Sequence, residues 1–356
     1  MAGLAPRVLI RGSGTSAWAA AAAAGALGCE VVLAAGQTGP RPAVLLNRVT
    51  VRVLQDLIGG IEDLIGHSWV VERRIVRWGQ NPEAMVGEPS LAVSARALTE
   101  ALERDCRSRL GRRIQVQALR AEPAPDVDWE IRAGGDKQRT DLEMVWGRRV
   151  VVAAGVRFGR HDMERTAWME TVAGEWLFYF PTSRLAGVVQ LMLPAPTDTP
   201  RERLQAALAR SGLRHRDVRL DEEGAISYRA CPALGAHTCE RGAVAVGSGA
   251  ARLDPLCGDG TGFAVRSSLL AAAVIDYSRG TKDLESPIRH YRSRIIGALA
   301  NHLRACDHFY SETVGDAAWS AEIERGRKGI AELQAAIPAE PCEHRLVERK
   351  LVAMRG

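Results

Sequence analysis

The first residues whose types and spacing could do chemistry form a glycine-rich turn near the N-terminus. Gly12, Gly14 and Ala17 fit the pattern G-x-G-x-x-G/A in the stretch "VLIRGSGTSAW". Such a turn needs small residues because a pyrophosphate must approach the backbone N–H groups at the start of the following helix. The alternative interpretation is an Ala-rich helix that only happens to follow a strand. The flanking elements decide between the two.

The elements around this turn have the order that phosphate binding requires. The apolar run 8–10 predicts a buried strand, an Ala-rich helix extends to Gly28, and the apolar run 31–33 predicts a second strand. Together they form a β-α-β unit, which is the context that gives the motif its meaning. The sequence therefore predicts a dinucleotide site at the start of the first helix.

A second glycine cluster begins more than 230 residues later, in "AVAVGSGAARLDPLCGDGTGF" (243–263). An apolar strand runs into Gly247, and Asp254-Pro255 precedes a glycine turn that opens another Ala-rich helix. This segment resembles the second FAD motif of the aromatic-hydroxylase and tryptophan-halogenase superfamily, which reads G-D-A-A, a short loop, P, then G-x-G. Small residues there let the backbone approach the flavin, and the helix directs its positive N-terminus at the flavin edge. The resemblance implies that FAD is the cofactor.

The same resemblance assigns the cofactor-binding residues. "GTSAW" resembles the G-T-A-G-W variant of the halogenase-like flavoproteins, so Thr15 and Trp18 match that branch. "VVVAAG" (150–155) corresponds to a strand that ends beside FAD, and Arg96 to an arginine that opens a helix and reaches the cofactor. The predicted FAD-binding residues are Gly12, Gly14, Thr15, Ser16, Ala17, Arg96, Gly155, Gly247, Ser248, Asp254, Pro255, Gly258, Asp259, Gly260, Thr261 and Gly262.

Three positions depart from the family pattern. Ser248 replaces the aspartate expected after Gly247, Ala35 replaces the acid expected at the end of the second strand, and Ala153 replaces an aspartate of the small-residue turn. FAD is then bound more weakly, or other residues supply these contacts.

The resemblance implies an FAD-dependent monooxygenase that hydroxylates an aromatic substrate through a flavin hydroperoxide. An indole or a Trp side chain is favoured as the substrate, including a Trp within a partner polypeptide, as in the branch that acts in quinone cofactor biogenesis. No catalytic residue or general base is assigned, and electrons come from NAD(P)H or from a partner reductase. The aromatic residues predicted to line the substrate pocket, each with core packing as its alternative, are Trp78, Trp176, Phe178 and Phe180.

Other functions within this superfamily are weighed on the same residues. Halogenation is disfavoured because the region 66–79 has no lysine to relay hypohalous acid, and because Asp259 would repel chloride. Arg73, Arg74 and Arg77 are interpreted as a solvated face, although one of them could hold an acidic substrate or peptide. A flavin-dependent reductase of the prenyl-chain type and a degenerate, non-catalytic binding partner remain as alternatives.

Composition limits the location and the partners. The chain has 356 residues, a formal charge of +5 and 46% hydrophobic residues, which is ordinary for a globular protein. Seven cysteines without C-x-x-C pairs indicate a reducing compartment, so a cytoplasmic location is expected. The apolar stretch 17–28 is too short to enter a membrane stably, and the Arg-rich pieces carry no nucleic-acid recognition motif. His302, Cys306 and His308 lack further ligands nearby in sequence, so no metal is expected.

The predicted fold class is α/β. It combines a discontinuous FAD-binding, Rossmann-like domain of the two-dinucleotide type with an inserted mixed-sheet substrate domain and a helical C-terminus. A helix is expected over 94–111, a strand over 114–119, a hairpin around Gly134-Gly135 and a buried parallel strand over 148–155. The predicted boundaries are 1–60, 90–160 and 240–280 for FAD binding, 61–89 and 161–239 for substrate, and 281–356 for the helical C-terminal region.

Overall fold

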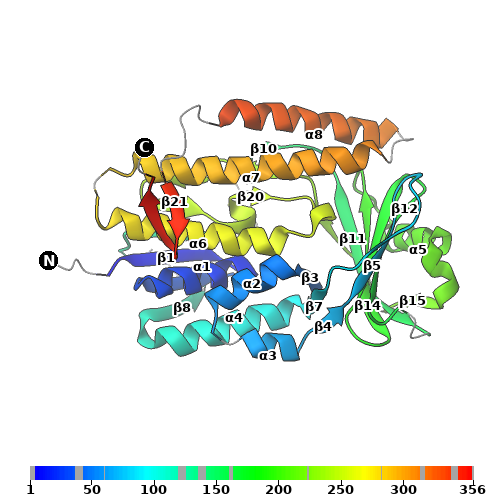
Figure 1. Cartoon of the computed structure of the whole chain (residues 1–356), viewed down its shortest axis with the longest axis horizontal. Helices are drawn as coiled ribbons and strands as arrows, with labels where there is room; N and C mark the ends of the chain where they lie inside the picture. The colour runs from blue at the N-terminus through cyan, green and yellow to red at the C-terminus, as the bar shows by residue number, and fades with distance from the viewer. Residues whose placement is uncertain are drawn as a thin grey trace.

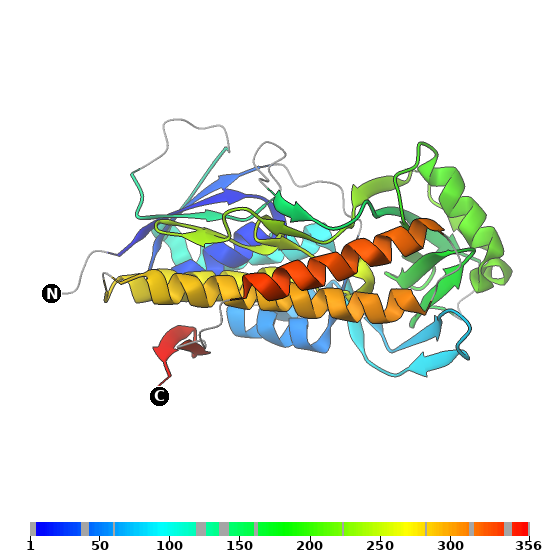
Figure 2. The ribbon, with the colours of Figure 1, turned by 90° about the horizontal axis from the view of Figure 1, so that it is seen from above.

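The computed structural model describes residues 5–36, 43–59, 61–118, 126–134, 142–159, 163–222, 224–281, 283–312, 317–337 and 344–354. A six-stranded sheet with its helices forms one end of the molecule, and an eight-stranded sheet forms the other (Figure 1). Two long helices, α7 (Glu285–Ser311) and α8 (Ala317–Ala336), lie side by side across the molecule, as Figure 2 shows from above. No described helix is both long enough and apolar enough to cross a bilayer.

The six-stranded sheet has the order β18-β19-β9-β1-β2-β8. All neighbours in it are parallel except β18 and β19, and the predicted β-α-β unit at its centre is confirmed. The strands are β1 (Arg7–Gly12), β2 (Glu30–Ala35), β8 (Ile114–Ala118), β9 (Trp129–Arg132), β18 (Cys239–Glu240) and β19 (Ala243–Ala245).

Helix α1 (Gly14–Ala26) packs between α4 (Ala95–Leu110) and α6 (Gly260–Ser278). Every residue of α1 from 17 to 25 is buried, because alanine side chains let three helices approach closely. Ser94 caps α4 by accepting a hydrogen bond from the Ala97 N–H, at 3.3 Å. Smaller elements complete this end of the molecule: β3 (Ala43–Asn47), β4 (Trp69–Val71), β7 (Ser90–Ser94), α2 (Arg48–Leu57) and α3 (Ile61–Gly66).

The eight-stranded sheet has the order β15-β11-β14-β13-β12-β5-β6, with β16 paired to β11. It is mixed, as predicted, because β5 and β12 are parallel whereas the other pairs are antiparallel. The strands are β5 (Arg73–Arg77), β6 (Ala84–Val86), β11 (Val150–Phe158), β12 (Thr166–Val172), β13 (Glu175–Pro181), β14 (Ala186–Leu193), β15 (Val218–Leu220) and β16 (Ile226–Arg229).

The two faces of this sheet have different neighbours. On the outer face, Trp168, Leu177 and Tyr179 pack against helix α5 (Pro200–Arg210). The inner face carries Met169, Trp176, Phe178 and Met192 and packs against side chains of α7 and α8. Alternation along β13 therefore directs Trp176, Phe178 and Phe180 to the same, inner side.

The predicted hairpin around Gly134-Gly135 is wrong. β9 does not pair with the next strand, β10 (Leu142–Val145), but joins β1 and β19 in parallel. β10 instead pairs with β17 (Ala233–Gly235), which also pairs with β20 (Ala251–Arg252). The chain therefore passes from the six-stranded sheet to a three-stranded sheet between β9 and β10.

The predicted parallel strand over 148–155 is also wrong. This segment is β11, and it lies antiparallel to β14, β15 and β16 in the eight-stranded sheet. Its continuous apolar run arises because α5 covers one face and α7 and α8 cover the other. A strand buried on both faces has the same pattern whatever its direction. The end of the predicted FAD-binding segment 90–160 therefore lies in the other sheet.

The C-terminal region 281–356 is not helical throughout, in contrast to the prediction. After α8, strands β21 (His344–Val347) and β22 (Lys350–Ala353) form an antiparallel hairpin. The hairpin packs on α6, where the His344 ring contacts the Tyr277 ring edge-on at 5.1 Å between centroids.

Candidate functional site

Three adjacent parallel strands, β1, β9 and β19, end at the same edge of the six-stranded sheet, and their backbone turns touch. A Cβ atom on Gly12 would lie 2.6 Å from the Gly134 carbonyl oxygen and 3.0 Å from the Ala133 Cβ. A Cβ atom on Gly249 would lie 2.7 Å from the Arg132 carbonyl oxygen and 3.0 Å from the Gly134 N. Any larger side chain at Gly12 or Gly249 would push the turns apart, so the residue sizes are fixed by backbone contact.

The turn at Ala133-Gly134 was missed as a site element by sequence reasoning. A usable signal was present, because "WEIRA" is a short strand pattern that runs into glycine, as the other two site strands do. Gly134 adopts a φ of +74° and faces Ser248. This turn therefore lies at the strand edge where the sequence analysis had placed "VVVAAG".

Gly155 is not brought to this edge. It pairs with Val188 inside the eight-stranded sheet, and a Cβ atom on it would contact the Asp221 carboxylate. The reason for assigning it to the cofactor is thereby removed. The Arg96 side chain, at the start of α4, is 87% exposed and bonds Glu100 at 2.7 Å, so its cofactor role stays a prediction.

Two helices begin at this edge with small residues in their first turns. α1 starts at Gly14 and α6 at Gly260, and neither Ser13 nor Asp259 caps its helix through its side chain. Uncapped N–H groups and the helix dipole favour an anionic group at such an end. A Cβ atom on Gly247 would lie 2.8 Å from the Ser16 Cβ, so the β19 turn lies directly against α1.

The glycines at the start of α6 differ in the space around them. Around Gly258 and Gly260 no heavy atom of the described residues lies within 4 Å of an added Cβ, and Gly258 has a φ of +62°. At Gly262 a Cβ atom would meet the Thr50 Oγ1 at 2.6 Å, which places Thr261 and Gly262 beside α2. Asp259 is ion-paired with Arg266. That pairing offsets the negative charge expected to repel chloride, so Asp259 alone does not exclude halide.

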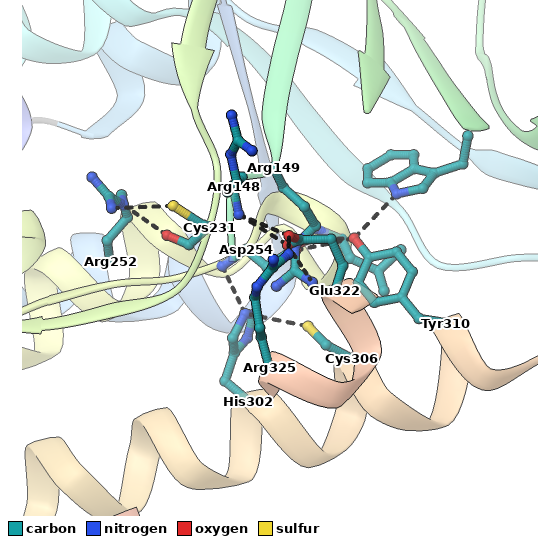
Figure 3. A network of polar contacts seen from close by, with 12 residues as sticks. Arg148, Arg149, Cys231, Arg252, Asp254, His302, Cys306, Tyr310, Glu322 and Arg325 are labelled. Atoms are coloured by element: carbon teal, nitrogen blue, oxygen red, sulfur yellow. Dashed lines mark hydrogen bonds and ion pairs between the residues drawn. The ribbon is translucent and has the colours of Figure 1, made fainter. Parts of the chain in front are cut away.

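Asp254 has a structural role instead of the predicted cofactor contact. Its buried carboxylate accepts hydrogen bonds from the Tyr310 hydroxyl, 3.0 Å from each oxygen, and from the Leu256 N–H at 2.9 Å. It also pairs with Arg149 at 3.0 Å, as Figure 3 shows. Pro255 begins the short 3₁₀ turn that follows. Residues 254–259, hereafter the proline loop, are therefore held by protein contacts that occupy the Asp254 carboxylate.

Arg149 links this loop to the eight-stranded sheet and to both long helices (Figure 3). It directly precedes β11, is 1% exposed, and pairs with Glu322 of α8 at 3.6 Å as well as with Asp254. Glu322 accepts two hydrogen bonds from the Arg148 N–H, at 2.9 and 3.1 Å. Burial alone would lower the pKa of Arg149, but Asp254, Tyr310 and Glu322 raise it above its ordinary value. The guanidinium therefore stays charged at the centre of the molecule.

The aromatic residues predicted to line a substrate pocket divide into two kinds. Trp78 and Trp176 are buried and donate their indole N–H groups to α7, at the Phe309 carbonyl (2.8 Å) and the Tyr310 hydroxyl (3.1 Å). Phe180 is 1% exposed in a separate core cluster. Only Phe178 of these four is partly exposed on the inner face. The substrate role remains a prediction, which we retain for Phe178.

Arg74 is one of three arginines that the sequence analysis interpreted as a solvated face, with the alternative that one of them holds an acidic substrate or peptide. Its guanidinium lies 5.4 Å from the centre of the Phe178 ring, on the inner face of β5. Burial lowers the pKa of Arg74, while Glu88 acts in the opposite sense. No hydrogen-bond or ion-pair partner of this guanidinium lies among the described residues. A half-buried cation beside an aromatic ring is suited to an anionic aromatic ligand.

A hollow of about 430 Å³ lies elsewhere, on the outer face of the eight-stranded sheet. Trp168 and Glu170 line it together with the basic side chains Arg77, Arg210, Arg214, His215 and Arg216. It lies on the opposite side of the sheet from Phe178 and is not part of the candidate site.

Comparison with known proteins establishes the fold. No family model matches the chain, and no curated protein matches its sequence. The peptidyl tryptophan dihydroxylase QhpG, essential for tryptophylquinone cofactor biogenesis, is similar with a TM-score of 0.75 at 19% identity, over 89% of this chain and 78% of that one.

Two further flavoenzymes share the architecture. The myxobacterial chondrochloren halogenase CndH gives a TM-score of 0.75 at 16% identity, over 93% of this chain and 90% of its own. The flavin-dependent monooxygenase PieE, solved with FAD and substrate, gives a TM-score of 0.66 at 17% identity. The match covers 94% of this chain and 72% of PieE. The chain therefore has the fold of FAD-dependent halogenases and monooxygenases, which confirms the predicted fold class.

Replacing Arg149 with methionine should destabilise the protein severely. Removing the guanidinium leaves the buried Asp254 carboxylate without a cation and leaves Glu322 with Arg325 alone, so we expect the free energy of unfolding to fall by about 3–5 kcal/mol. Urea-induced unfolding measures this change. The control is Arg157→Met on β11, whose side chain is 80% exposed and pairs with Asp221 at 3.2 Å. Its effect should stay within about 1 kcal/mol. Equal losses in the two variants would contradict the role given to Arg149.

Proposed function

We propose that the protein is an FAD-dependent monooxygenase that hydroxylates an indole or a Trp side chain. The fit of the cofactor rests on the three touching turns at Gly12, Gly134 and Gly247 and on the two helices that begin beside them. Bound FAD would supply the redox chemistry that activates dioxygen for insertion into an aromatic ring. Backbone N–H groups at the start of α1 would hold the pyrophosphate, and those of α6 would hold negative charge on the flavin.

The observation that carries the proposal is the contact between the proline loop and the inner face of the eight-stranded sheet. Leu256 of the loop belongs to the same buried cluster as Met169, Trp176 and Met192 of the sheet. The loop that would approach the flavin is thereby fixed against an aromatic and apolar surface. Such a surface excludes water and orients a ring, which is what the protein must contribute to hydroxylation.

Phe178 and Arg74 are the residues that we propose contact the substrate. Phe178 is partly exposed on the inner face, and Gln190 lies opposite it on β14. An indole stacked near Phe178 would leave an attached carboxylate, or an acidic neighbour in a peptide, within reach of Arg74. The substrate class is therefore an aromatic ring that carries a negative charge.

Halogenation is the second candidate, because CndH shares the fold. A halogenase of the kind that the sequence resembles needs a lysine beside the substrate. The chain has four lysines; Lys328 lies on α8, Lys350 lies on β22, and Lys137 and Lys282 lie outside the described residues. Neither Lys328 nor Lys350 lies on the eight-stranded sheet, so the described part of the inner face favours hydroxylation.

The proposal is tested on the full chain supplied with reduced FAD, oxygen and three probes: indole, indole-3-acetate and a Trp-containing acidic peptide. We expect a yellow protein, substrate-dependent oxygen uptake, and a product heavier by one oxygen atom in mass spectrometry. A colourless protein would indicate the non-catalytic alternative. Reduction of an alkene without oxygen uptake would indicate the reductase, and a chlorinated product in chloride would indicate the halogenase.

Gly12→Ala should weaken FAD binding. The new Cβ atom would lie 2.6 Å from the Gly134 carbonyl oxygen, at a φ of +141°. We expect the dissociation constant for FAD to rise by about 10-fold or more, since such strain costs on the order of 1–3 kcal/mol. Fluorescence titration of the flavin measures this constant. Gly297→Ala, in an open position on α7, is the matched control and should bind like the wild type. Wild-type affinity for FAD in Gly12→Ala would contradict a cofactor site at the three touching turns.

Arg74→Met should raise the KM for indole-3-acetate and leave the KM for indole unchanged. Loss of a charge-assisted hydrogen bond is worth about 1.5–3 kcal/mol, which corresponds to a factor of about 10–100 in binding. Steady-state oxygen uptake with both probes measures the difference. Arg73→Met is the control, because Arg73 lies on the opposite face of β5 and bonds the Thr166 hydroxyl at 3.0 Å. A parallel change for both probes would argue against a carboxylate contact.

A further inference from the structure

The proline loop and α7 together form a cluster of two thiols and one imidazole. The ligand atoms of Cys257, His302 and Cys306 all lie within 4.8 Å of one another. Cys257 ends the 3₁₀ turn of the proline loop, whereas His302 and Cys306 are one helical turn apart on α7. Cys257 precedes His302 by 45 positions and Cys306 by 49. The spacing of residues along α7 therefore does not reveal the third member of the cluster.

The geometry of the cluster is close to that of a zinc site. The Cys306 Sγ lies 3.5 Å from the His302 Nε2. Tetrahedral zinc, with Zn–S and Zn–N bonds of about 2.3 and 2.0 Å, places a sulfur and a nitrogen ligand about 3.5 Å apart and two sulfurs about 3.8 Å apart. His308, which the sequence placed beside this pair, does not take part. Its side chain is 72% exposed and pairs with Glu312.

The burial of the three residues defines an open site. His302 and Cys306 are buried, whereas Cys257 is exposed, so one side of the cluster reaches solvent. Three protein ligands with one accessible position are typical of zinc sites that accept a water molecule or a further ligand. Two thiolates would also neutralise a divalent cation, which makes its partial burial acceptable.

His302 already accepts a hydrogen bond through the nitrogen that would bind a metal. The Asp254 N–H donates a hydrogen bond to the His302 Nε2 at 2.8 Å (Figure 3). Ligation through this nitrogen would replace that bond, and the freed N–H could then donate to a cysteine thiolate. The Asp254 carboxylate is already held by Arg149 and Tyr310, so it does not compete for the metal.

We propose that Cys257, His302 and Cys306 bind one thiophilic divalent cation, with Zn²⁺ as the expected metal. The thiol and imidazole ligands select against Mg²⁺ and Ca²⁺, which prefer oxygen. The metal would join the proline loop to α7 beside the start of α6. Its binding does not depend on the proposed oxygenase function.

The test uses the reduced full chain under anaerobic conditions, titrated with Co²⁺ as a spectroscopic probe and with Zn²⁺. We expect one equivalent of Co²⁺ to produce the intense visible d–d bands of tetrahedral cobalt, to the red of flavin absorption, and one equivalent of Zn²⁺ to bleach them. Zn²⁺ should also raise the melting temperature. Elemental analysis of protein purified without chelators should give about one zinc per chain.

Three variants separate the site from other thiols. Cys257→Ser changes an exposed residue and should fold normally but lose the tetrahedral bands and the thermal shift. Cys306→Ala should do the same. Cys239→Ser, which changes an equally buried cysteine outside the cluster, should behave like the wild type. Absence of cobalt bands in the fully reduced wild type, or their persistence in Cys257→Ser, would overturn the proposal.

Discussion

The structure depends on a single buried cation, the Arg149 guanidinium. Taking a charge out of water costs several kcal/mol, and only well-placed opposite charges offset that cost. Arg149 meets Asp254 at one end and Glu322 at the other, so the proline loop and α8 must both be docked on β11 before the charge is satisfied. The loop is thereby fixed by electrostatics as well as by its contacts with His302 and Tyr310. The same ion pairs set its distance from the eight-stranded sheet.

Helix α7 extends this constraint along the molecule. Tyr291 bonds the Ala245 carbonyl at the end of β19, and His302 accepts the Asp254 N–H. Near the C-terminal end of the helix, the Phe309 carbonyl and the Tyr310 hydroxyl accept the indole N–H groups of Trp78 and Trp176. One rigid helix thus contacts the edge of the six-stranded sheet, the proline loop and the inner face of the eight-stranded sheet. Burial raises the pKa of Tyr310 well above its ordinary value, with Asp254 adding to the effect, so its hydroxyl remains a donor.

The sequence was sufficient to predict those elements that depend on the pattern of neighbouring residues. The β-α-β unit and helix α4 were both predicted, because apolar spacing within a few residues sets them. It was insufficient where burial on two faces hides strand direction, as in β11, and where glycines mark a change of sheet, as at Gly134. The buried ion cluster joins Arg149 to Asp254 and Glu322, each more than 70 positions away. No periodicity encodes such a contact.

Charge pairing at the strand edge gives the site its electrostatic character. Each acidic side chain described beside the three turns is paired with an arginine: Glu130 with Arg11 at 3.2 Å, Asp254 with Arg149, and Asp259 with Arg266. An unpaired carboxylate about 4 Å from a phosphate would cost on the order of 4 kcal/mol near a protein surface.

The replacement of family acids by Ser248 and Ala35 acts in the same direction, because it removes negative charge from this edge. It also removes two side-chain contacts that the family pattern would provide to the proposed cofactor. Recognition of FAD would then be left to backbone N–H groups and helix ends. Those groups stay in place only while the glycines keep the three turns in contact. Packing of small residues, rather than any single side-chain contact, is therefore what the proposed cofactor site requires.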